Sequence, residues 1–276
     1  RGLGDVYKRQ EMQIKTQAEM GSGEESIATT VAARKLLDIL RALSDQQEIS
    51  MSYSNKKLVL AQGKSKFSLQ TLAAEEFPTV SVADTYPAKV VLSQKALKNL
   101  LHLVHFSMAQ QDIRYYLNGL LLVIDQDSLK AVATDGHRLA FSAVKSTEEG
   151  VSINVGPDRQ EVIIPRKAVL ELQRLLTDSE TPVIIEFAAN QARFTFDQIE
   201  LLSKLIEGKF PDYQRVIPTG HTKHVSMERE LLLGSLQRAA ILTTDKFKGV
   251  RLTLSSGCLR VSSTNAEQEE ASEDLE

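Results

Sequence analysis

The 276-residue sequence has little of what a disulfide-bonded or membrane-spanning protein requires. Its single cysteine, Cys258, has no partner within the chain, so an internal disulfide is excluded and a reducing cytoplasm is the expected compartment. It contains no run of about 18 apolar residues, which excludes a hydrophobic transmembrane helix. The first residues contain no apolar segment of the kind that is typical of a secretory signal. We therefore expect a cytoplasmic protein with no membrane partner.

Signatures of catalysis and of cofactor binding are also missing. The sequence has no glycine-rich phosphate loop and no serine or cysteine nucleophile motif, and its five histidines are scattered. We expect no catalytic residue, no metal and no cofactor. The string ATDGHRLA leaves one alternative open, because Asp135 and His137 could act as the acid–base pair of a hydrolase. A turn with a polar cap is the commoner role of such a string.

What the sequence does contain is an internal repeat. The segment Thr29–Pro78 resembles Val162–Pro211: the pair Phe77-Pro78 recurs as Phe210-Pro211 at an offset of 133 residues. A near-constant offset over about 50 residues indicates two copies of one folding unit. Function is then expected to depend on how units are arrayed rather than on one catalytic cleft.

A second pairing relates Val90–Asp135 to His224–Asn265. The folding unit therefore has two halves, and along the chain they occur in the order second half, first half, second half, first half. We expect residues 1–10 to be a non-native segment, residues 11–88 to be the C-terminal part of a first module, residues 89–222 to be a complete second module, and residues 223–276 to be the N-terminal part of a third. The chain is expected to lack the start of the first module and the end of the third.

Two periodicities alternate within each unit and predict an α+β fold. Short β-rich runs bounded by turn residues predict antiparallel strands, at Leu58–Leu60, Leu120–Ile124, Lys130–Ala133, Val183–Phe187, Ala192–Phe196, Val250–Leu254 and Leu259–Ser262. Apolar residues at helical spacing predict four helices, with faces formed by Leu36, Ile39, Leu40 and Leu43; by Leu97, Leu100, Leu101 and Val104; by Val169, Leu172, Leu175 and Leu176; and by Leu232, Leu236 and Ala239. Pro165 stands at a helix start, and Ser93 and Ser226 occupy expected N-cap positions.

Charge is segregated between the helices and the rest of the chain. The four helical spans carry ten basic and four acidic residues, although the whole chain has a net charge of −3. A basic helical layer suits a phosphate backbone, while simple solvation of the helix faces is the alternative. The two ends are also opposite in charge: Ile49–Ala73 has four lysines and no acid, and Glu267–Glu276 has six acids and no base. The acidic run is either a disordered tail or an edge that meets a basic edge on another copy, as in a head-to-tail ring.

Six strings together carry a family resemblance. FSMAQQDIRYYLNG, VATDGHRLA, VIIPRKAVLEL, SKLIEGKFPDYQRVIP, DKFKGVRL and NAEQEEA resemble the β subunit, or sliding clamp, of bacterial DNA polymerase III, and the resemblance extends from Glu11 to Glu276. It implies repeated clamp modules, with antiparallel sheets outside and two helices per module lining the inner face, closed as a homodimeric ring around duplex DNA. The implied function is that of a non-catalytic, nucleoid-associated processivity factor. Its partners would be duplex DNA, the replicative polymerase, the clamp loader and other clamp-binding peptides. A repeat scaffold that binds only proteins is the alternative.

The resemblance also implies three sets of site residues. The partner-peptide pocket would comprise Leu117, Thr134, Gly136, His137, Arg138, Leu139, Pro211, Arg215 and Val216. The DNA-binding residues would be Gln111, Arg114, Tyr115 and Tyr116, with Lys95, Lys98, Arg166 and Lys167 as backbone contacts. The dimer edge would use Lys64, Lys66, Phe67, Leu69, Ile241, Leu242, Glu267, Glu269 and Glu270.

Overall fold

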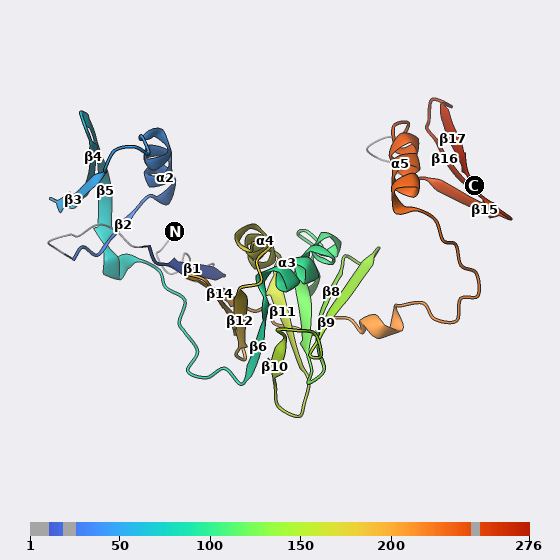
Figure 1. The fold of residues 1–276 in the computed structure, drawn as a ribbon, viewed down its shortest axis with the longest axis horizontal. Helices are drawn as coiled ribbons and strands as arrows, with labels where there is room; N and C mark the ends of the chain where they lie inside the picture. The colour runs from blue at the N-terminus through green and yellow to red at the C-terminus, as the bar shows by residue number, and fades with distance from the viewer. Residues whose placement is uncertain (1–10, 19–25, 244–248) are drawn as a thin grey trace. The chain divides into compact units, whose positions relative to one another are not determined.

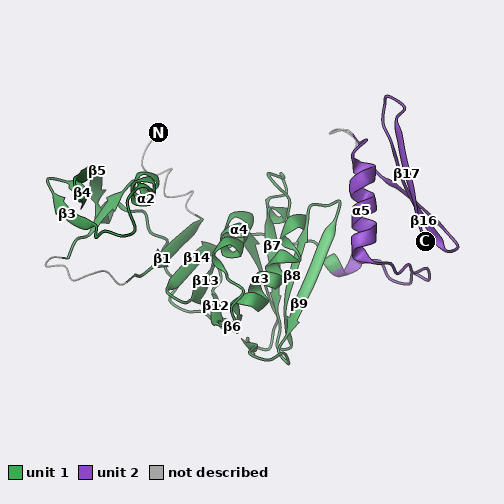
Figure 2. Ribbon diagram, turned by 45° about the horizontal axis from the view of Figure 1, so that its top comes forward, with its two compact units in different colours: residues 1–213 green, residues 214–276 purple. Residues whose placement is uncertain are grey.

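The computed structural model describes residues 11–18, 26–243 and 249–276. The chain divides into two compact units, one ending at Tyr213 and the other covering Gln214–Glu276 (Figure 2). Residues 1–10, for which the sequence suggested a non-native segment, lie outside the described residues. No helix among the described residues is long and apolar enough to cross a membrane.

The centre of the first unit consists of two antiparallel sheets (Figure 1). The six-stranded sheet has the order β1-β14-β13-β12-β6-β10. Its strands are β1 (Met12–Thr16), β14 (Ile199–Lys204), β13 (Gln191–Phe196), β12 (Pro182–Phe187), β6 (Ala88–Ser93) and β10 (Ser152–Asn154). The four-stranded sheet has the order β11-β7-β8-β9. Its strands are β11 (Gln160–Pro165), β7 (Gly119–Ile124), β8 (Ser128–Thr134) and β9 (Leu139–Lys145).

Helices α3 (Gln94–His102) and α4 (Arg166–Leu175) pack against each other and against strands of both sheets. The helical spacing read from the sequence explains this packing, because Leu97 and Val169 are fully buried together with Phe187 of the six-stranded sheet. Ser93 is the N-cap of α3, as predicted: its side chain accepts a hydrogen bond from the Ala96 amide at 3.2 Å. The α+β prediction is confirmed.

The other face of the four-stranded sheet carries a second apolar cluster. Its buried residues are Ala109, Leu117, Leu121, Val123, Val132, Ile163, Phe210 and Tyr213. Along β7 and β8, these residues alternate with residues that face the core beneath α3 and α4. Strand β7 is consequently buried on both faces. It begins at a glycine for a steric reason, since a Cβ on Gly119 would lie 2.6 Å from the Ile164 carbonyl oxygen.

The N-terminal part of the first unit repeats the order of elements seen in the centre. Strand β2 (Thr29–Val31), helix α2 (Ala33–Ala42) and strands β3 (Ser50–Ser54), β4 (Lys57–Gln62) and β5 (Ser65–Ala73) follow the same sequence as β11, α4, β12, β13 and β14. A short 3-10 helix, η1 (Ala74–Glu76), follows β5. The core of this part is small: Leu58, Leu60 and Leu69 are buried, whereas α2 has no buried residue.

The second unit packs helix α5 (Arg229–Ala240) on a three-stranded sheet of β15 (Arg251–Ser255), β16 (Cys258–Thr264) and β17 (Glu270–Leu275). The acidic run Glu267–Glu276 therefore lies in the turn before β17 and in β17 itself rather than in a disordered tail, and Leu275 is buried in the core of the unit. The prediction of Ser226 as an N-cap is wrong, because α5 is preceded by Glu228 and that side chain makes no cap hydrogen bond. Met227 packs against the same core, so the chain stays extended past Ser226 before the helix begins.

Candidate functional sites

The turn between β8 and β9 presents most of the residues expected in the peptide pocket. The Asp135 carboxylate accepts hydrogen bonds from the backbone amides of His137 and Arg138 at 2.9 and 3.0 Å. The Thr134 hydroxyl accepts one from the Gly136 amide at 3.1 Å and donates one to the Arg138 carbonyl at 2.7 Å. Gly136 has a φ of 88°, a conformation that favours glycine. The turn is thus fixed by its own polar groups, with His137 and Arg138 exposed.

These contacts argue against a hydrolytic pair. One oxygen of Asp135 faces backbone amides and the other lies 3.2 Å from Nε of Arg138. Hydrogen bonding from the Arg138 amide is the chief cause that lowers the pKa of Asp135, which makes this carboxylate a weaker base. The motif therefore works as a capped turn. Among the described residues, no three His, Cys, Asp or Glu side chains gather where they could hold a metal ion.

The loop that carries Asp112 and Arg114 is held against this turn by the Arg114 side chain. Asp112 pairs with the Arg114 guanidinium at 2.8 and 3.0 Å, and this hydrogen bonding lowers the pKa of Asp112 to about 2. Asn118 braces the loop by bonding both the amide and the carbonyl of Asp112. Arg114 also donates to the Asp135 carbonyl at 3.3 Å. A residue expected to bind DNA therefore lies against the turn expected to bind peptides.

The second apolar cluster lies beneath this turn. Leu117 is 1% exposed within that cluster, and Leu139 packs against it from the edge strand β9. Pro211 is exposed and follows Phe210, which is buried in the same cluster. The arrangement provides an apolar base beneath the polar, fixed turn. Arg215 and Val216 belong to the second unit, where both are exposed.

Two aromatic residues that were not expected at the site also contact this region. Arg138 donates to the Phe106 carbonyl at 2.8 Å, and its guanidinium carbon lies 5.5 Å from the centre of the Phe106 ring. Phe141, on β9, stacks on Tyr213 at 5.9 Å between ring centres. No spacing in the sequence links Phe106 to Arg138, because the contact comes from η2 (His105–Ser107), which packs beside β8 and β9.

The residues expected on the DNA side differ in how freely they are presented. Gln111 and Tyr115 are exposed, and Tyr115 and Tyr116 make an edge-on contact within η3 (Tyr115–Leu117). Lys167 is exposed, whereas Arg166 is half-buried and donates to the Met108 carbonyl at 3.4 Å.

Lys95 and Lys98 are not isolated cations. Lys95 lies 3.0 Å from Glu180, and Lys98 lies 3.2 Å from Asp178. The Lys95 ammonium, followed by the Ser93 hydroxyl, holds the pKa of Glu180 below its usual value. The positive charge of Lys95 and Lys98 on α3 is therefore offset by the loop that carries Asp178 and Glu180. Because this loop is distant in sequence, a count of charges along α3 alone does not include it.

The residues expected at the dimer edge occupy three separate segments, one in the first unit and two in the second. Lys64 and Lys66 are exposed at the start of β5, where Phe67 is half-buried; Leu69 is buried in the core of its own module. In the second unit, Ile241 is 76% exposed and is followed by Leu242 just after α5. Glu267 and Glu269 lie in the turn before β17, which Asn265 caps, and Glu270 begins that strand.

Comparison with known proteins places this architecture in one family. Three family models match the chain in order: the N-terminal domain of the DNA polymerase III beta subunit at residues 8–81, the central domain at 91–212, and the C-terminal domain at 214–276. A "Beta sliding clamp" from Pseudomonas putida is 44% identical over 89% of this chain, and the chain spans 65% of that relative's length. The Escherichia coli K12 clamp is 40% identical over 96% of this chain and 70% of its own length.

Solved structures agree with this assignment. A crystal structure of the DNA polymerase III subunit beta from Pseudomonas aeruginosa superposes with a TM-score of 0.89 at 40% identity, covering 96% of this chain and 71% of that one. A second P. aeruginosa clamp structure, bound to griselimycin, matches with the same TM-score and covers 97% of this chain. The repeated α+β modules, the three domain matches and the relatives together show that the chain belongs to the bacterial DNA polymerase III beta subunit, or β sliding clamp, family.

Proposed function

We propose that this chain acts as a sliding clamp, a DNA polymerase processivity factor that surrounds duplex DNA without sequence specificity. It performs no chemistry of its own in this proposal. It holds a replicative polymerase near the DNA through a peptide site and so raises the local concentration of that polymerase at the primer end. The observation that carries the proposal is the match, in order, of all three domains of the beta subunit.

The proposed peptide site is the surface of the first unit formed by the Thr134–Leu139 turn and Pro211, above the apolar cluster that contains the buried Leu117. Arg215 and Val216, which belong to the second unit, stay predictions from the family resemblance. A short linear segment would place aliphatic and aromatic anchors on the apolar base and hydrogen-bond to the polar rim. Two features support this choice. The turn is held by internal hydrogen bonds, so little ordering entropy is lost on binding. Leu117 and Leu139 belong to one apolar cluster at its base.

The proposed DNA side comprises Gln111, Arg114, Tyr115 and Tyr116. Contacts to the DNA backbone would come from Lys95 and Lys98 of α3 and from Arg166 and Lys167 of α4. Contacts of this kind go to phosphates and carry no sequence information. Binding should therefore be loose and should weaken steeply with salt. Both properties suit a protein that moves along a duplex.

The module boundaries and the ring are proposed from the way neighbouring modules pair. Strand β1 of the first module pairs antiparallel with β14, the last strand of the second. By the repeat, β17 of the third module corresponds to β1, and β5 of the first module corresponds to β14. Strand β2 pairs with β5 only at Thr71–Ala73, so the Ser65–Gln70 stretch has no strand partner on that side among the described residues.

We propose that β17 of one copy pairs with this stretch of another, closing a homodimeric head-to-tail ring. The charges are complementary, since Lys64 and Lys66 stand at the start of β5 and acidic residues precede and occupy β17. The modules in this proposal are residues 11–88, 89–222 and 223–276. The location proposed is the cytoplasm, where the duplex DNA of a bacterium lies.

Equilibrium binding to duplex DNA tests the proposal. The protein should bind labelled 30-base-pair duplexes of unrelated sequence equally, with an affinity that falls as salt rises. Replacing Lys95, Lys98, Arg166 and Lys167 by alanine should weaken all of these affinities and flatten the salt dependence, because counterion release is lost at each phosphate contact. A scaffold that binds only proteins would bind no duplex and would be unaffected by these substitutions.

A further inference from the structure

We propose that Asp178 and Glu180, in the loop between α4 and β12, compete with DNA phosphates for Lys98 and Lys95 and thereby keep this surface only weakly attached to DNA. The inference rests on the proposed function and adds a control element to it. The two acids are positioning residues that limit how firmly the neighbouring lysines can hold a phosphate.

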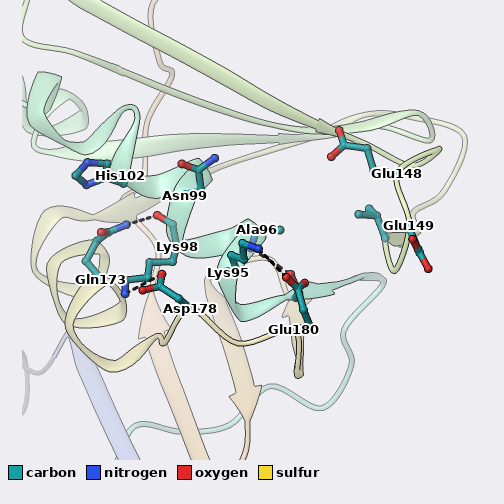
Figure 3. A pocket seen from close by; sticks show the side chains of 12 residues that line it. Lys95, Ala96, Lys98, Asn99, His102, Glu148, Glu149, Gln173, Asp178 and Glu180 are labelled. Atoms are coloured by element: carbon teal, nitrogen blue, oxygen red, sulfur yellow. Dashed lines mark hydrogen bonds and ion pairs between the residues drawn. The ribbon is translucent and has the colours of Figure 1, made fainter. Parts of the chain in front are cut away.

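The geometry supports an exchange of partners. Lys95 Nζ lies 3.0 Å from Glu180 and Lys98 Nζ lies 3.2 Å from Asp178 (Figure 3). The carboxylate side chains are 72% and 79% exposed, so an incoming phosphate can displace them from the side of the solvent. An exposed ion pair of this kind is weak, so the competition reduces phosphate binding without abolishing it.

The loop that carries the acids is held firmly against the start of α3. Gln94 is fully buried, and its side chain donates to the Thr181 hydroxyl at 2.7 Å and accepts from the Thr177 amide at 3.1 Å. The amides of Gln94 and Lys95 donate to the Thr181 and Ser179 carbonyls at 2.9 and 3.0 Å. The carboxylates are thus positioned in advance. The same contacts use two of the free amides at the helix N-terminus that would otherwise attract an anion.

The surroundings of the two lysines are acidic rather than basic. A hollow of about 810 Å³ between α3 and the loop after β9 is lined by Lys95 and Lys98 and by four carboxylates, those of Glu148, Glu149, Asp178 and Glu180. Figure 3 shows Glu148 and Glu149 on the opposite side of the hollow from the two ion pairs. With two positive and four negative groups, the local field repels phosphate. A more strongly basic face would bind the duplex more tightly, whereas this balanced face binds it loosely.

The variant that tests the inference is Asp178→Asn combined with Glu180→Gln. The probe is a fluorescein-labelled 30-base-pair duplex, followed by anisotropy from 50 to 200 mM salt. The variant should bind about 3- to 30-fold more tightly at low salt, since each released lysine gains an interaction of the size of an exposed ion pair. The slope of log affinity against log salt should steepen by less than about 2, because the two partial phosphate contacts of Lys95 and Lys98 become full ones.

Two controls separate this effect from others. Asp127→Asn with Asp158→Asn makes the same change of charge at two exposed positions in other turns of the same module. It should increase the affinity far less. Adding Lys95→Gln and Lys98→Gln to the test variant should remove the gain in affinity.

The outcomes are distinguishable. Equal gains from the test variant and the Asp127/Asp158 control would mean a general effect of net charge and would overturn the inference. An unchanged affinity in a test variant that melts like the parent would overturn it as well. If the parent protein binds no duplex at any salt concentration and is also not retained on circular plasmid after loading, the proposed function itself fails. If it is retained on circles but neither parent nor variant binds the short duplex, the inference fails and the function stands. If the parent binds and only the variant effect is absent, the inference alone fails.

Discussion

Gly136 offers a sharp test of the link between the turn and the Arg114 loop. Its φ of 88° is one that L residues adopt only under strain, and alanine there should cost about 1–3 kcal/mol of stability. A Cβ at this position would also lie 3.1 Å from both terminal nitrogens of Arg114, tighter than ordinary contact. The guanidinium would then move by a few tenths of an ångström, and its hydrogen bond to the Asp135 carbonyl, already 3.3 Å long, would weaken.

Gly150 provides the matched control. Its φ is 76°, yet a Cβ there would meet nothing within 4 Å. Gly136→Ala and Gly150→Ala should therefore lose similar free energies of unfolding, measured in urea. Only Gly136→Ala should also weaken the binding of a labelled pentapeptide that carries one leucine and one phenylalanine. The expected loss is about 2- to 10-fold, corresponding to one net hydrogen bond. Equal peptide affinities in the two variants would refute the role assigned to the Arg114 contact.

Three further substitutions test the packing and the electrostatics. Gly119→Ala would bring a Cβ to 2.6 Å from the Ile164 carbonyl oxygen and should cost about 3 kcal/mol in a denaturant titration; an unchanged midpoint would contradict the close approach of β7 and β11. Asp112 has its pKa lowered from 3.8 to about 2, so its contribution is complete above about pH 4 and is lost as pH falls towards 2. The stability difference between the parent and Asp112→Asn should shrink over that range, and a difference that stays constant from pH 6 to 2.5 would exclude the pairing with Arg114. Gln94→Ala should remove the hydrogen bonds that this fully buried side chain makes with Thr177 and Thr181, at a cost of about 1–3 kcal/mol, and should speed amide exchange in residues 176–181 more than elsewhere; uniform exchange rates would show that the loop does not depend on this side chain.

Much of the fold can be read from the sequence because its signals are local. The spacing of Leu97 and Leu101 predicts the buried face of α3, and Ser93 predicts its N-terminus; both are confirmed. The cap assigned to Ser226 is wrong because tertiary packing of Met227 outweighs a local preference. The internal repeat seen in the sequence is matched by the structure, since β2, α2, β3, β4 and β5 follow the same order as β11, α4, β12, β13 and β14.

The candidate sites are less predictable because their key contacts are not local. Lys98 meets Asp178 from 80 positions away, and Arg114 meets the Asp135 carbonyl from 21. Counting charges along one helix therefore overstates how basic its surroundings are. The residues of the turn itself were identifiable, because an aspartate followed by glycine and two polar residues predicts a capped turn.

The central claim is that this protein surrounds DNA, and its most direct test is topological. The protein is placed on nicked circular plasmid by a bacterial clamp loader with ATP, and the DNA is then separated by gel filtration in high salt. If the protein surrounds DNA, it should elute with the circular plasmid and should be lost when a single cut makes the plasmid linear. Retention on linear DNA equal to that on circles, or no retention on either, would contradict it.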